Sequence, residues 1–294
     1  MKIGFIGLGI MGKPMCKNLM KAGYEVVIPA RNKSIADEFV ALGASVASTP
    51  KEIAEQADVV IAMLPNSPQV KEVVLGANGI IEAAKPGLTV IDMSSIAPLV
   101  SREIAAKLAE KGMEMLDAPV SGGEPKAIDG TLSVMVGGKQ EVFDKCYPIM
   151  KAMAGSVVLT GAVGAGNVTK LANQIIVAIN IAAVSEALVL ASKAGVEPEL
   201  VFNAIRGGLA GSTVLDAKAP MMMDRNFNPG FRINLHIKDL NNVLETSHEV
   251  GVPLPLTASV MEMMQALKVD EKDGQDHSAL VQYYEKMAKV EVKR

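Results

Sequence analysis

The pattern of apolar and polar positions changes once along the chain, near residue 161. Before that point, short apolar runs alternate with stretches that have helical spacing. Apolar strands that alternate with helices predict a mostly parallel, doubly wound sheet with both faces covered. The pattern predicts strands at residues 2–6, 25–28, 58–64, 89–93, 113–118, 132–136 and 157–159, and helices at residues 13–22, 100–111 and 140–153.

The second part of the chain has helical spacing and no strand pattern. Helices are expected at residues 167–194, 197–206, 233–250, 256–267 and 278–288. We therefore predict an α/β fold: a Rossmann-type dinucleotide-binding domain at 1–162 and an all-α domain at 163–294, joined by a long helix. Because that helix carries small apolar residues on more than one side, we expect it to be buried at a domain or subunit interface, in a homodimer or homotetramer.

A glycine-rich turn follows the first predicted strand. The apolar residues 3–6 run directly into Gly7-Leu8-Gly9-Ile10-Met11-Gly12, and a helix is expected next. In this arrangement the first glycine permits the turn, the second lets a pyrophosphate approach the backbone, and the third lets the helix pack on the strand. The free N–H groups at the helix start favour phosphate. The strand-turn-helix setting favours an NAD or NADP site over a simple tight turn.

Composition narrows the possible partners. The chain has 294 residues, 49% of them apolar, and a net charge of −3, so no basic field for nucleic acid is present. Two cysteines, Cys16 and Cys146, are too few for a disulfide framework, and the histidines lack metal-ligand spacing, so we expect no metal. The longest apolar stretch, residues 171–190, is interrupted by polar residues, and the N-terminus lacks a signal-peptide pattern. These features predict a cytoplasmic protein with no membrane contact.

The second predicted strand ends without the acidic residue that NAD-type domains use to bind the ribose hydroxyls. Arg31-Asn32 follows instead, and a guanidinium suits the oxygens of a 2′-phosphate. A solvated loop arginine is the alternative, so the sequence permits NADPH and does not exclude NADH. Leu64-Pro65 and Ser95 follow two further strands at the sheet edge where ligands bind in open α/β folds.

Two segments near the middle of the chain carry candidate chemistry. Ser121-Gly122-Gly123 follows a strand and exposes backbone N–H groups and a hydroxyl, which suits a small carboxylate, although a turn without a ligand has the same composition. Lys170 lies early in the long apolar helix, with Asn173 and Gln174 on the same face. A lysine in that setting is costly to bury unless it has partners or a task.

A late segment, FRINLHIKD from Phe231 to Asp239, places Lys238-Asp239 on a predicted helix, where a solvated ion pair is the simplest interpretation. With this segment, four motifs occur in order: GFIGLGIMG, DAPVSGG, GAGNVTKLANQ and LHIKDL. Together they resemble the β-hydroxyacid dehydrogenase family over essentially the whole chain. Within that family the chain looks most similar to the tartronate semialdehyde reductases; 6-phosphogluconate dehydrogenases share two of the motifs but are much longer.

The resemblance implies roles for individual residues. Lys170 matches the catalytic lysine, Ser121, Gly122 and Gly123 match the substrate loop, and Lys238 matches a lysine near the bound cofactor. Ser95 stands where many relatives have threonine, and Phe231 joins the cofactor-binding set. Relatives commonly carry asparagine four residues after the lysine, whereas this chain has Asn173 at the third position and Gln174 at the fourth. Which amide orients the substrate stays open.

The resemblance implies reduction of 2-hydroxy-3-oxopropionate to glycerate by NADH or NADPH, with the small hydroxyacid or semialdehyde as the partner molecule. Reduction of an aldehyde creates an alkoxide that needs a proton and a nearby positive charge. A lysine supplies both if burial lowers its pKa from about 10.4 towards neutrality. The alternatives are a 3-hydroxyisobutyrate dehydrogenase or another short semialdehyde reductase and, in a different class, an NAD(P)-sensing module without turnover.

Overall fold

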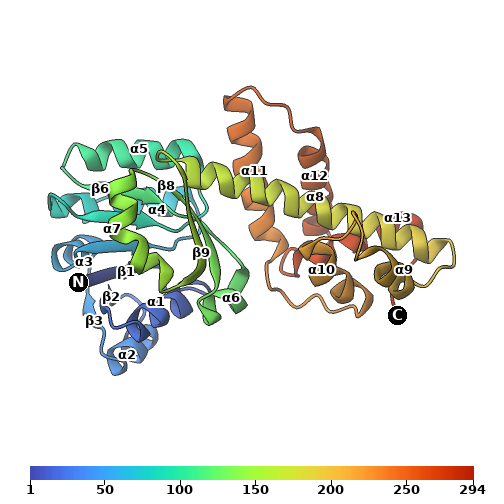
Figure 1. The fold of residues 1–294 in the computed structure, drawn as a ribbon, viewed down its shortest axis with the longest axis horizontal. Helices are drawn as coiled ribbons and strands as arrows, with labels where there is room; N and C mark the ends of the chain where they lie inside the picture. Colours follow the sequence, from blue (N-terminus) through green and yellow to red (C-terminus); the bar gives the residue numbers. More distant parts are fainter. The chain divides into compact units, whose positions relative to one another are not determined.

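The computed structural model describes residues 1–294, which form two compact units, Met1–Lys170 and Leu171–Arg294 (Figure 1). The long helix α8 (Ala165–Lys193) begins in the first unit and continues into the second. The predicted Rossmann-type and all-α parts therefore share one continuous helix.

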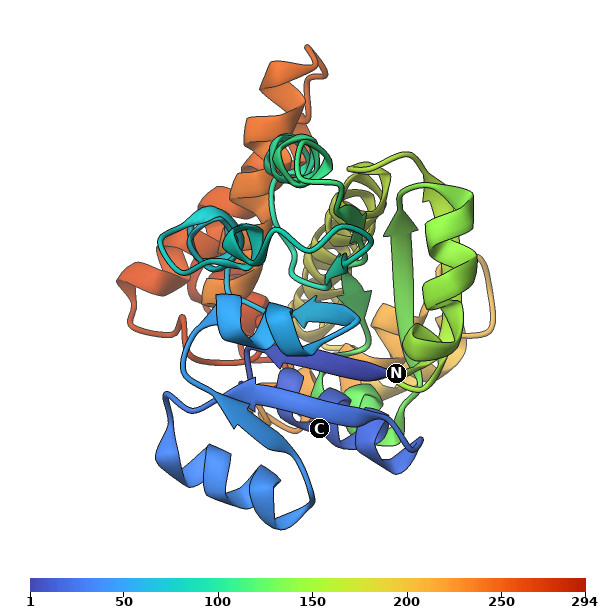
Figure 2. The ribbon, with the colours of Figure 1, turned by 90° about the vertical axis from the view of Figure 1, so that its left-hand side faces the viewer.

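The first unit is built on a nine-stranded sheet in the order β3-β2-β1-β4-β5-β6-β8-β7, with β9 paired to β8. The strands from β3 to β6 are parallel, and β8 runs antiparallel to β6 and β7. β1 and β2, dark blue in Figure 2, lie side by side. The strands are β1 (Lys2–Ile6), β2 (Glu25–Pro29), β3 (Ser45–Ala47), β4 (Val59–Ala62), β5 (Thr89–Asp92), β6 (Glu114–Asp117), β7 (Val120–Ser121), β8 (Leu132–Gly137) and β9 (Ala154–Gly161).

Helices cover both faces of this sheet because successive side chains of a strand point to opposite faces. Ile3 and Phe5 of β1 are fully buried in one core, which α1, α6 and α7 complete. Val60 of β4 and Val90 of β5 are fully buried in a second core with α3, α4 and α5. The helices are α1 (Gly12–Lys21), α2 (Lys33–Ala41), α3 (Pro50–Gln56), α4 (Ser67–Leu75), α5 (Pro98–Ala109), α6 (Gly123–Asp129) and α7 (Gln140–Lys151), with a 3₁₀ turn, η1 (Ile80–Ala83).

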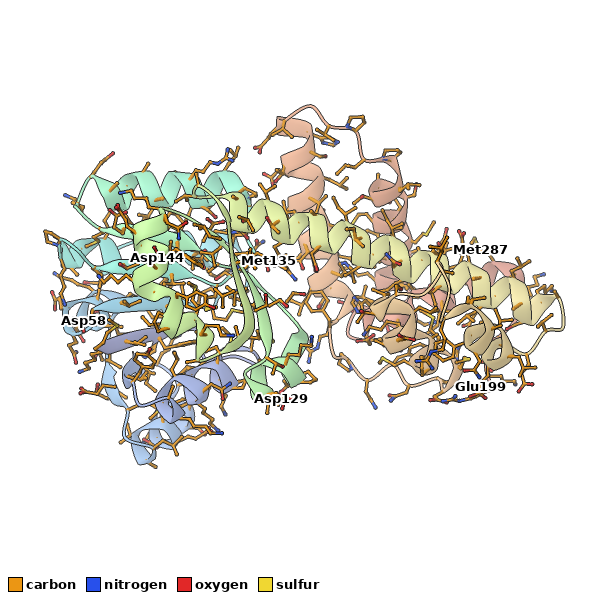
Figure 3. All side chains as sticks on the ribbon, viewed as in Figure 1. Asp58, Asp129, Met135, Asp144, Glu199 and Met287 are labelled. Carbon is orange, nitrogen blue, oxygen red and sulfur yellow. The ribbon has the colours of Figure 1, made fainter.

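The second unit consists of helices around one apolar core. Besides the rest of α8 it contains α9 (Pro198–Ile205), α10 (Thr213–Met223), α11 (Ile233–Glu249), α12 (Pro255–Val269), the 3₁₀ turn η2 (His277–Leu280) and α13 (Val281–Ala288). The last residue holds the end of the chain against this unit. Arg294 donates to both carboxylate oxygens of Asp224, at 2.6 and 2.7 Å, and to Glu199 of α9, at 2.7 Å. Glu199 is labelled in Figure 3.

By length and composition α8 could cross a membrane, a criterion that the core helix of a protein outside membranes also meets. Ile181 and Leu188 of α8 are fully buried in the core of the second unit. Other apolar side chains of the same helix are exposed, including Ile176 at 62% and Leu190 at 71%. The helix therefore carries both a core-facing side and an apolar surface.

The sequence pattern missed several elements, chiefly short ones. β3 and β7 contain three and two residues, too few to show an alternating pattern. α10 was also missed because Pro220 lies inside it and its apolar residues do not form one stripe. The helix predicted at residues 278–288 was wrong at its start, since His277–Leu280 forms a 3₁₀ turn and the α-helix begins at Val281.

Candidate functional site

The glycine-rich turn after β1 has the conformation that phosphate binding requires. Gly7 has φ of +104°, and a Cβ there would collide with the carbonyl oxygen of Met63. A Cβ on Gly12 would collide with the carbonyl oxygen of Gly7, so close helix–strand packing requires that glycine as well. At Gly9, by contrast, a Cβ would meet nothing within 4 Å. The backbone at Gly9 is therefore open to approach.

The helix that follows presents backbone N–H groups beside this opening. α1 begins at Gly12, and no side chain caps its first turn. Leu8 and Met11 are half-buried, and Ile10 is 56% exposed. Uncapped N–H groups at a helix start and an open glycine backbone fit a pyrophosphate. The residues present therefore fit a nicotinamide dinucleotide, whose phosphates the segment Gly7–Gly12 would hold.

Arg31 and Asn32 follow the carboxyl end of β2, one strand away from the glycine turn. The Arg31 side chain is exposed, and the Asn32 side chain caps α2 by accepting the Ile35 N–H at 3.2 Å. The capping bond fixes the turn that carries Arg31. In this position the guanidinium is available to a phosphate and the Asn32 amide has a structural role.

The ends of β4 and β5 are joined by buried polar groups. The Leu64 N–H donates to Ser94 Oγ at 2.9 Å, and the Ser94 N–H donates to Asp92 Oδ1 at 3.1 Å. Asp92 and Ser94 are fully buried, whereas Pro65 is exposed and Ser95 half-buried. The predicted cofactor residues Leu64, Pro65 and Ser95 thus lie on two loops that Ser94 holds together.

The predicted substrate loop lies after β6. Ser121 belongs to the two-residue strand β7, opposite Ser133 of β8, and Gly122 and Gly123 lead into α6. Gly122 has φ of +138°, which L side chains rarely adopt. A Cβ there would also come within 2.8 Å of the Lys126 side chain. The strand pairing and the glycine conformation thus define the backbone from which the Ser121 side chain and the two glycine N–H groups extend.

Asp117, which sequence reasoning did not single out, anchors the start of α8. It ends β6, is fully buried, and accepts the Gly164 N–H at 2.7 Å and the Asn167 N–H at 2.8 Å. Gly137 packs so closely that a Cβ there would collide with Asp117 Oδ1. The available sequence signal was a carboxylate that directly follows the apolar residues of a strand, and Asp92, opposite Asp117 in β5, shows the same signal.

Asn167 completes this anchor through its side chain. Its Oδ1 accepts the Ile96 N–H, its Nδ2 donates to Ser101 Oγ, both at 3.1 Å, and the residue is fully buried. The first turn of α8 is thereby tied to β6, to the loop after β5 and to α5. Lys170 follows three residues later on the same helix face and is 6% exposed. The buried hydrogen bonds of Asn167 thus fix the position of the helix backbone that carries the Lys170 side chain.

In the second unit, the candidate amides are linked to the candidate lysine of α11. Asn173 Nδ2 donates to Gln174 Oε1 at 2.8 Å, and Gln174 Nε2 donates to Asp239 Oδ2 at 2.6 Å. The Lys238 ammonium lies 2.7 Å from Asp239 Oδ1. Asp239 is only 2% exposed and Lys238 21%, so this pair is not the solvated one that was the alternative to a role at the cofactor. In an exposed ion pair both side chains would be mobile. Here the Asp239 carboxylate is held by burial and by its hydrogen bond from Gln174.

Phe231 lies just before α11, with its ring edge-on to two buried histidines, His236 and His277. Across residues 1–294, no group of three or more histidine, cysteine, aspartate or glutamate side chains is placed to hold a metal ion.

The cofactor and substrate candidates fall into two sets. One set lies on the strand ends and on α8 of the first unit, and the other lies on α8 and α11 of the second.

The charge of Asp117 generates a pH prediction. Burial raises the pKa of Asp117 to about 6, and the N–H groups of Asn167 and Gly164 oppose the shift only in part. An unfolded aspartate has a pKa of about 3.9, so between these values the native state holds more protons than the unfolded state. The free energy of unfolding of the wild type, relative to Asp117→Asn, should therefore fall by up to about 3 kcal/mol as the pH rises from about 4 to 7.

Urea unfolding of both proteins at several pH values in this range measures that difference. Asp117→Asn is the matched reference because it keeps one acceptor oxygen and cannot titrate. A difference that stays constant, or one that increases with pH, contradicts the assignment of a raised pKa to the buried carboxylate.

Comparisons with known proteins agree with this geometry. The family model for the NAD binding domain of 6-phosphogluconate dehydrogenase matches residues 2–161. The model described as the NAD-binding of NADP-dependent 3-hydroxyisobutyrate dehydrogenase matches residues 164–284. Both halves of the chain therefore match models of dehydrogenase domains that bind a nicotinamide dinucleotide.

The relatives extend the match over the whole chain. The 2-hydroxy-3-oxopropionate reductase of Escherichia coli is 46% identical over 98% of both chains, and the mitochondrial 3-hydroxyisobutyrate dehydrogenase of Mus musculus is 36% identical over 96% of this chain and 86% of its own. A Mycobacterium tuberculosis 3-hydroxyisobutyrate dehydrogenase structure with L-serine superposes with a TM-score of 0.89 at 33% identity, covering 96% of this chain and 98% of that one. The chain belongs to the β-hydroxyacid dehydrogenase family and is an NAD(P)-dependent oxidoreductase that acts on a CH–OH group.

Proposed function

We propose that this protein is a 2-hydroxy-3-oxopropionate (tartronate semialdehyde) reductase that forms glycerate. The observation that carries the proposal is the 46% identity with the Escherichia coli reductase over 98% of both chains. The placement of Lys170, Ser121 and Lys238 on fixed elements supports it. A sensor of the dinucleotide would need no proton donor, and Lys170 beside two amides favours turnover.

When bound to Gly7–Gly12, a reduced nicotinamide dinucleotide would supply a hydride for the aldehyde carbon of the substrate. The carbonyl oxygen then becomes an alkoxide that must gain a proton. In our proposal the Lys170 ammonium donates this proton to the oxygen, and its charge stabilises the developing anion before transfer. Burial of Lys170 excludes the water that would otherwise screen this charge.

The substrate carboxylate is assigned to the loop at Ser121. The Ser121 hydroxyl and the N–H groups of Gly122 and Gly123 are donors, as a carboxylate requires. Asn173 is the better candidate than Gln174 for the substrate hydroxyl. The Gln174 amide accepts from Asn173 and donates to Asp239, so both of its ends are engaged, and it is buried, whereas Asn173 is half-buried.

We also propose that the chain forms a homodimer or homotetramer. The support is the apolar surface of α8, where Ile176 and Leu190 are largely exposed. A helix whose apolar side chains extend beyond one core is typical of subunit interfaces.

The substrate assignment predicts a preference between two semialdehydes that differ at one carbon. Tartronate semialdehyde carries a hydroxyl where methylmalonate semialdehyde carries a methyl group. If Asn173 binds that hydroxyl, kcat/KM should be at least about tenfold higher for tartronate semialdehyde than for methylmalonate semialdehyde. Asn173→Ala should then lower the ratio of these two kcat/KM values. NADPH oxidation followed by absorbance measures both values. A preference for methylmalonate semialdehyde contradicts the proposal, and absence of turnover on either supports a sensor.

The proposed proton donor predicts separate effects for the two lysines. Lys170→Ala should lower kcat by about 10²- to 10³-fold with little change in cofactor affinity. Lys170→Arg should recover little activity, because a guanidinium keeps the charge but is too weak an acid to donate. Lys238→Ala is the matched control and should weaken cofactor binding more than it lowers kcat. Near-normal kcat in Lys170→Arg, with the loss confined to KM, would assign Lys170 to binding alone.

Arg31 predicts the cofactor preference. Its exposed guanidinium at the end of β2 suits a 2′-phosphate, so Arg31→Ala should raise the KM for NADPH by about tenfold and leave the KM for NADH nearly unchanged. Steady-state kinetics with each cofactor measures the two changes. Equal changes in both values would show that Arg31 does not contact a 2′-phosphate.

A further inference from the structure

Two buried histidines of the second unit touch each other through their rings. His236 lies on α11, and His277 is the first residue of η2. Their Nδ1 atoms are 3.0 Å apart, and the side chains are 0% and 6% exposed. The mechanism proposed above uses neither residue, and a pair of imidazoles at this distance needs a shared hydrogen.

The surroundings determine where that hydrogen lies. His236 Nε2 is 3.4 Å from the backbone carbonyl oxygen of Gln174, which can only accept, so Nε2 of His236 carries a hydrogen. In a neutral imidazole the other nitrogen is then an acceptor. His277 Nδ1 must therefore be the donor to His236 Nδ1. The hydrogen bonds run in one direction, from His277 to His236 to Gln174.

Charged groups fix His277 at the start of this chain of hydrogen bonds. Asp276 accepts from the Lys218 ammonium at 2.9 Å and from the N–H of Ser278 at 3.0 Å. The other Asp276 oxygen accepts the N–H groups of Gly230 and Phe231 at 3.0 and 3.1 Å. The same carboxylate therefore orients both the turn that carries His277 and the backbone that carries Phe231.

The histidine pair is linked to both candidate cofactor residues of this unit, directly to Phe231 and through Gln174 and Asp239 to Lys238. The Phe231 ring centroid lies 5.7 Å from that of His236 and 5.5 Å from that of His277, edge-on in both cases. Gln174 is held twice by α11, at its carbonyl oxygen by His236 and at its side-chain amide by Asp239. Asp239 also lies 2.7 Å from the Lys238 ammonium, so Gln174 and Lys238 share one buried carboxylate.

We propose that His277 and His236 are a positioning pair that orients Phe231 and, through Gln174 and Asp239, Lys238 for the bound dinucleotide. The inference rests on the proposed assignment of Phe231 and Lys238 to the cofactor. His236 and Asp239 are three residues apart and share one face of α11, which is why both reach Gln174. The pair acts through the direction of its hydrogen bonds as well as through packing, because with both rings neutral only one arrangement of hydrogens satisfies these contacts.

The first test reads the tautomers without cofactor or substrate. Two-bond ¹H–¹⁵N spectra of the imidazole rings in the full-length protein should show His277 with a hydrogen on Nδ1, and His236 with a hydrogen on Nε2 and none on Nδ1. A His277 ring protonated only on Nε2, or a His236 ring protonated on Nδ1, overturns the inference.

The second test measures the dissociation constant of NADPH by fluorescence titration. His277→Leu removes the donor and should weaken NADPH binding by about five- to tenfold. His277→Asn should stay within about twofold of the wild type, because the Asn amide nitrogen can replace Nδ1 as a donor. His248→Leu, at an exposed position of α11, the helix that carries His236, should leave NADPH binding unchanged.

A double-mutant cycle separates positioning from general packing. In a Lys238→Ala background, His277→Leu should weaken NADPH binding by less than about threefold, because its main target is already absent. Equal effects in both backgrounds, or an Asn variant as weak as the Leu variant, contradict the inference. If His277→Leu does not fold, the imidazole spectra and the NADPH dissociation constant of His277→Asn test the inference without it. A wild type that neither binds NADPH nor reduces a semialdehyde refutes the proposed function itself.

Discussion

The buried carboxylate of Asp117 is the interaction on which the candidate site of the first unit depends. A charge without solvent must be satisfied by donors, and here the donors are the N–H groups of Gly164 and Asn167 at the start of α8. These groups would otherwise have no partner within the helix, so carboxylate and helix start satisfy each other. Because Lys170 is one turn further along, the end of β6 fixes the origin of the proposed proton donor.

The two candidate lysines are positioned by different physical means. Lys170 depends on the backbone of a helix whose first turn is fixed by Asp117 and Asn167. Lys238 depends on a side-chain ion pair, since Asp239 holds its ammonium and Gln174 holds Asp239. The first arrangement suits a group that must meet a reacting atom, because the side chain starts from a fixed backbone and is buried. The second suits a charge that holds a cofactor, where a small displacement has less effect on chemistry.

The alternation of strands and helices, the glycine turn and the change to helices near residue 161 could be predicted because each depends on local pattern. Gly7, Gly9 and Gly12 have separate geometric tasks that sequence spacing already expresses. What could not be predicted depends on contacts distant in sequence. Asp117 meets Asn167 across fifty residues, and His236 meets His277 across forty-one, so no local signal shows either pair.

Residues of the same type also acquire different roles from their surroundings. Asn173 and Gln174 are adjacent amides that sequence spacing could not separate, yet Asp239 engages the Gln174 amide and leaves Asn173 as the half-buried candidate. His248 is exposed, whereas the other two histidines are buried against each other. In each case burial and partner, which only the fold supplies, distinguish the residues.

Chemical rescue of Lys170→Ala by small primary amines tests the central claim, proton donation by Lys170, most directly. If the missing group is a general acid, single-turnover reduction of tartronate semialdehyde should accelerate in proportion to the concentration of the protonated amine. The rate should also depend on the acidity of the amine across a series of similar size. Rescue that is absent with every amine, or that is independent of amine acidity, would contradict the account.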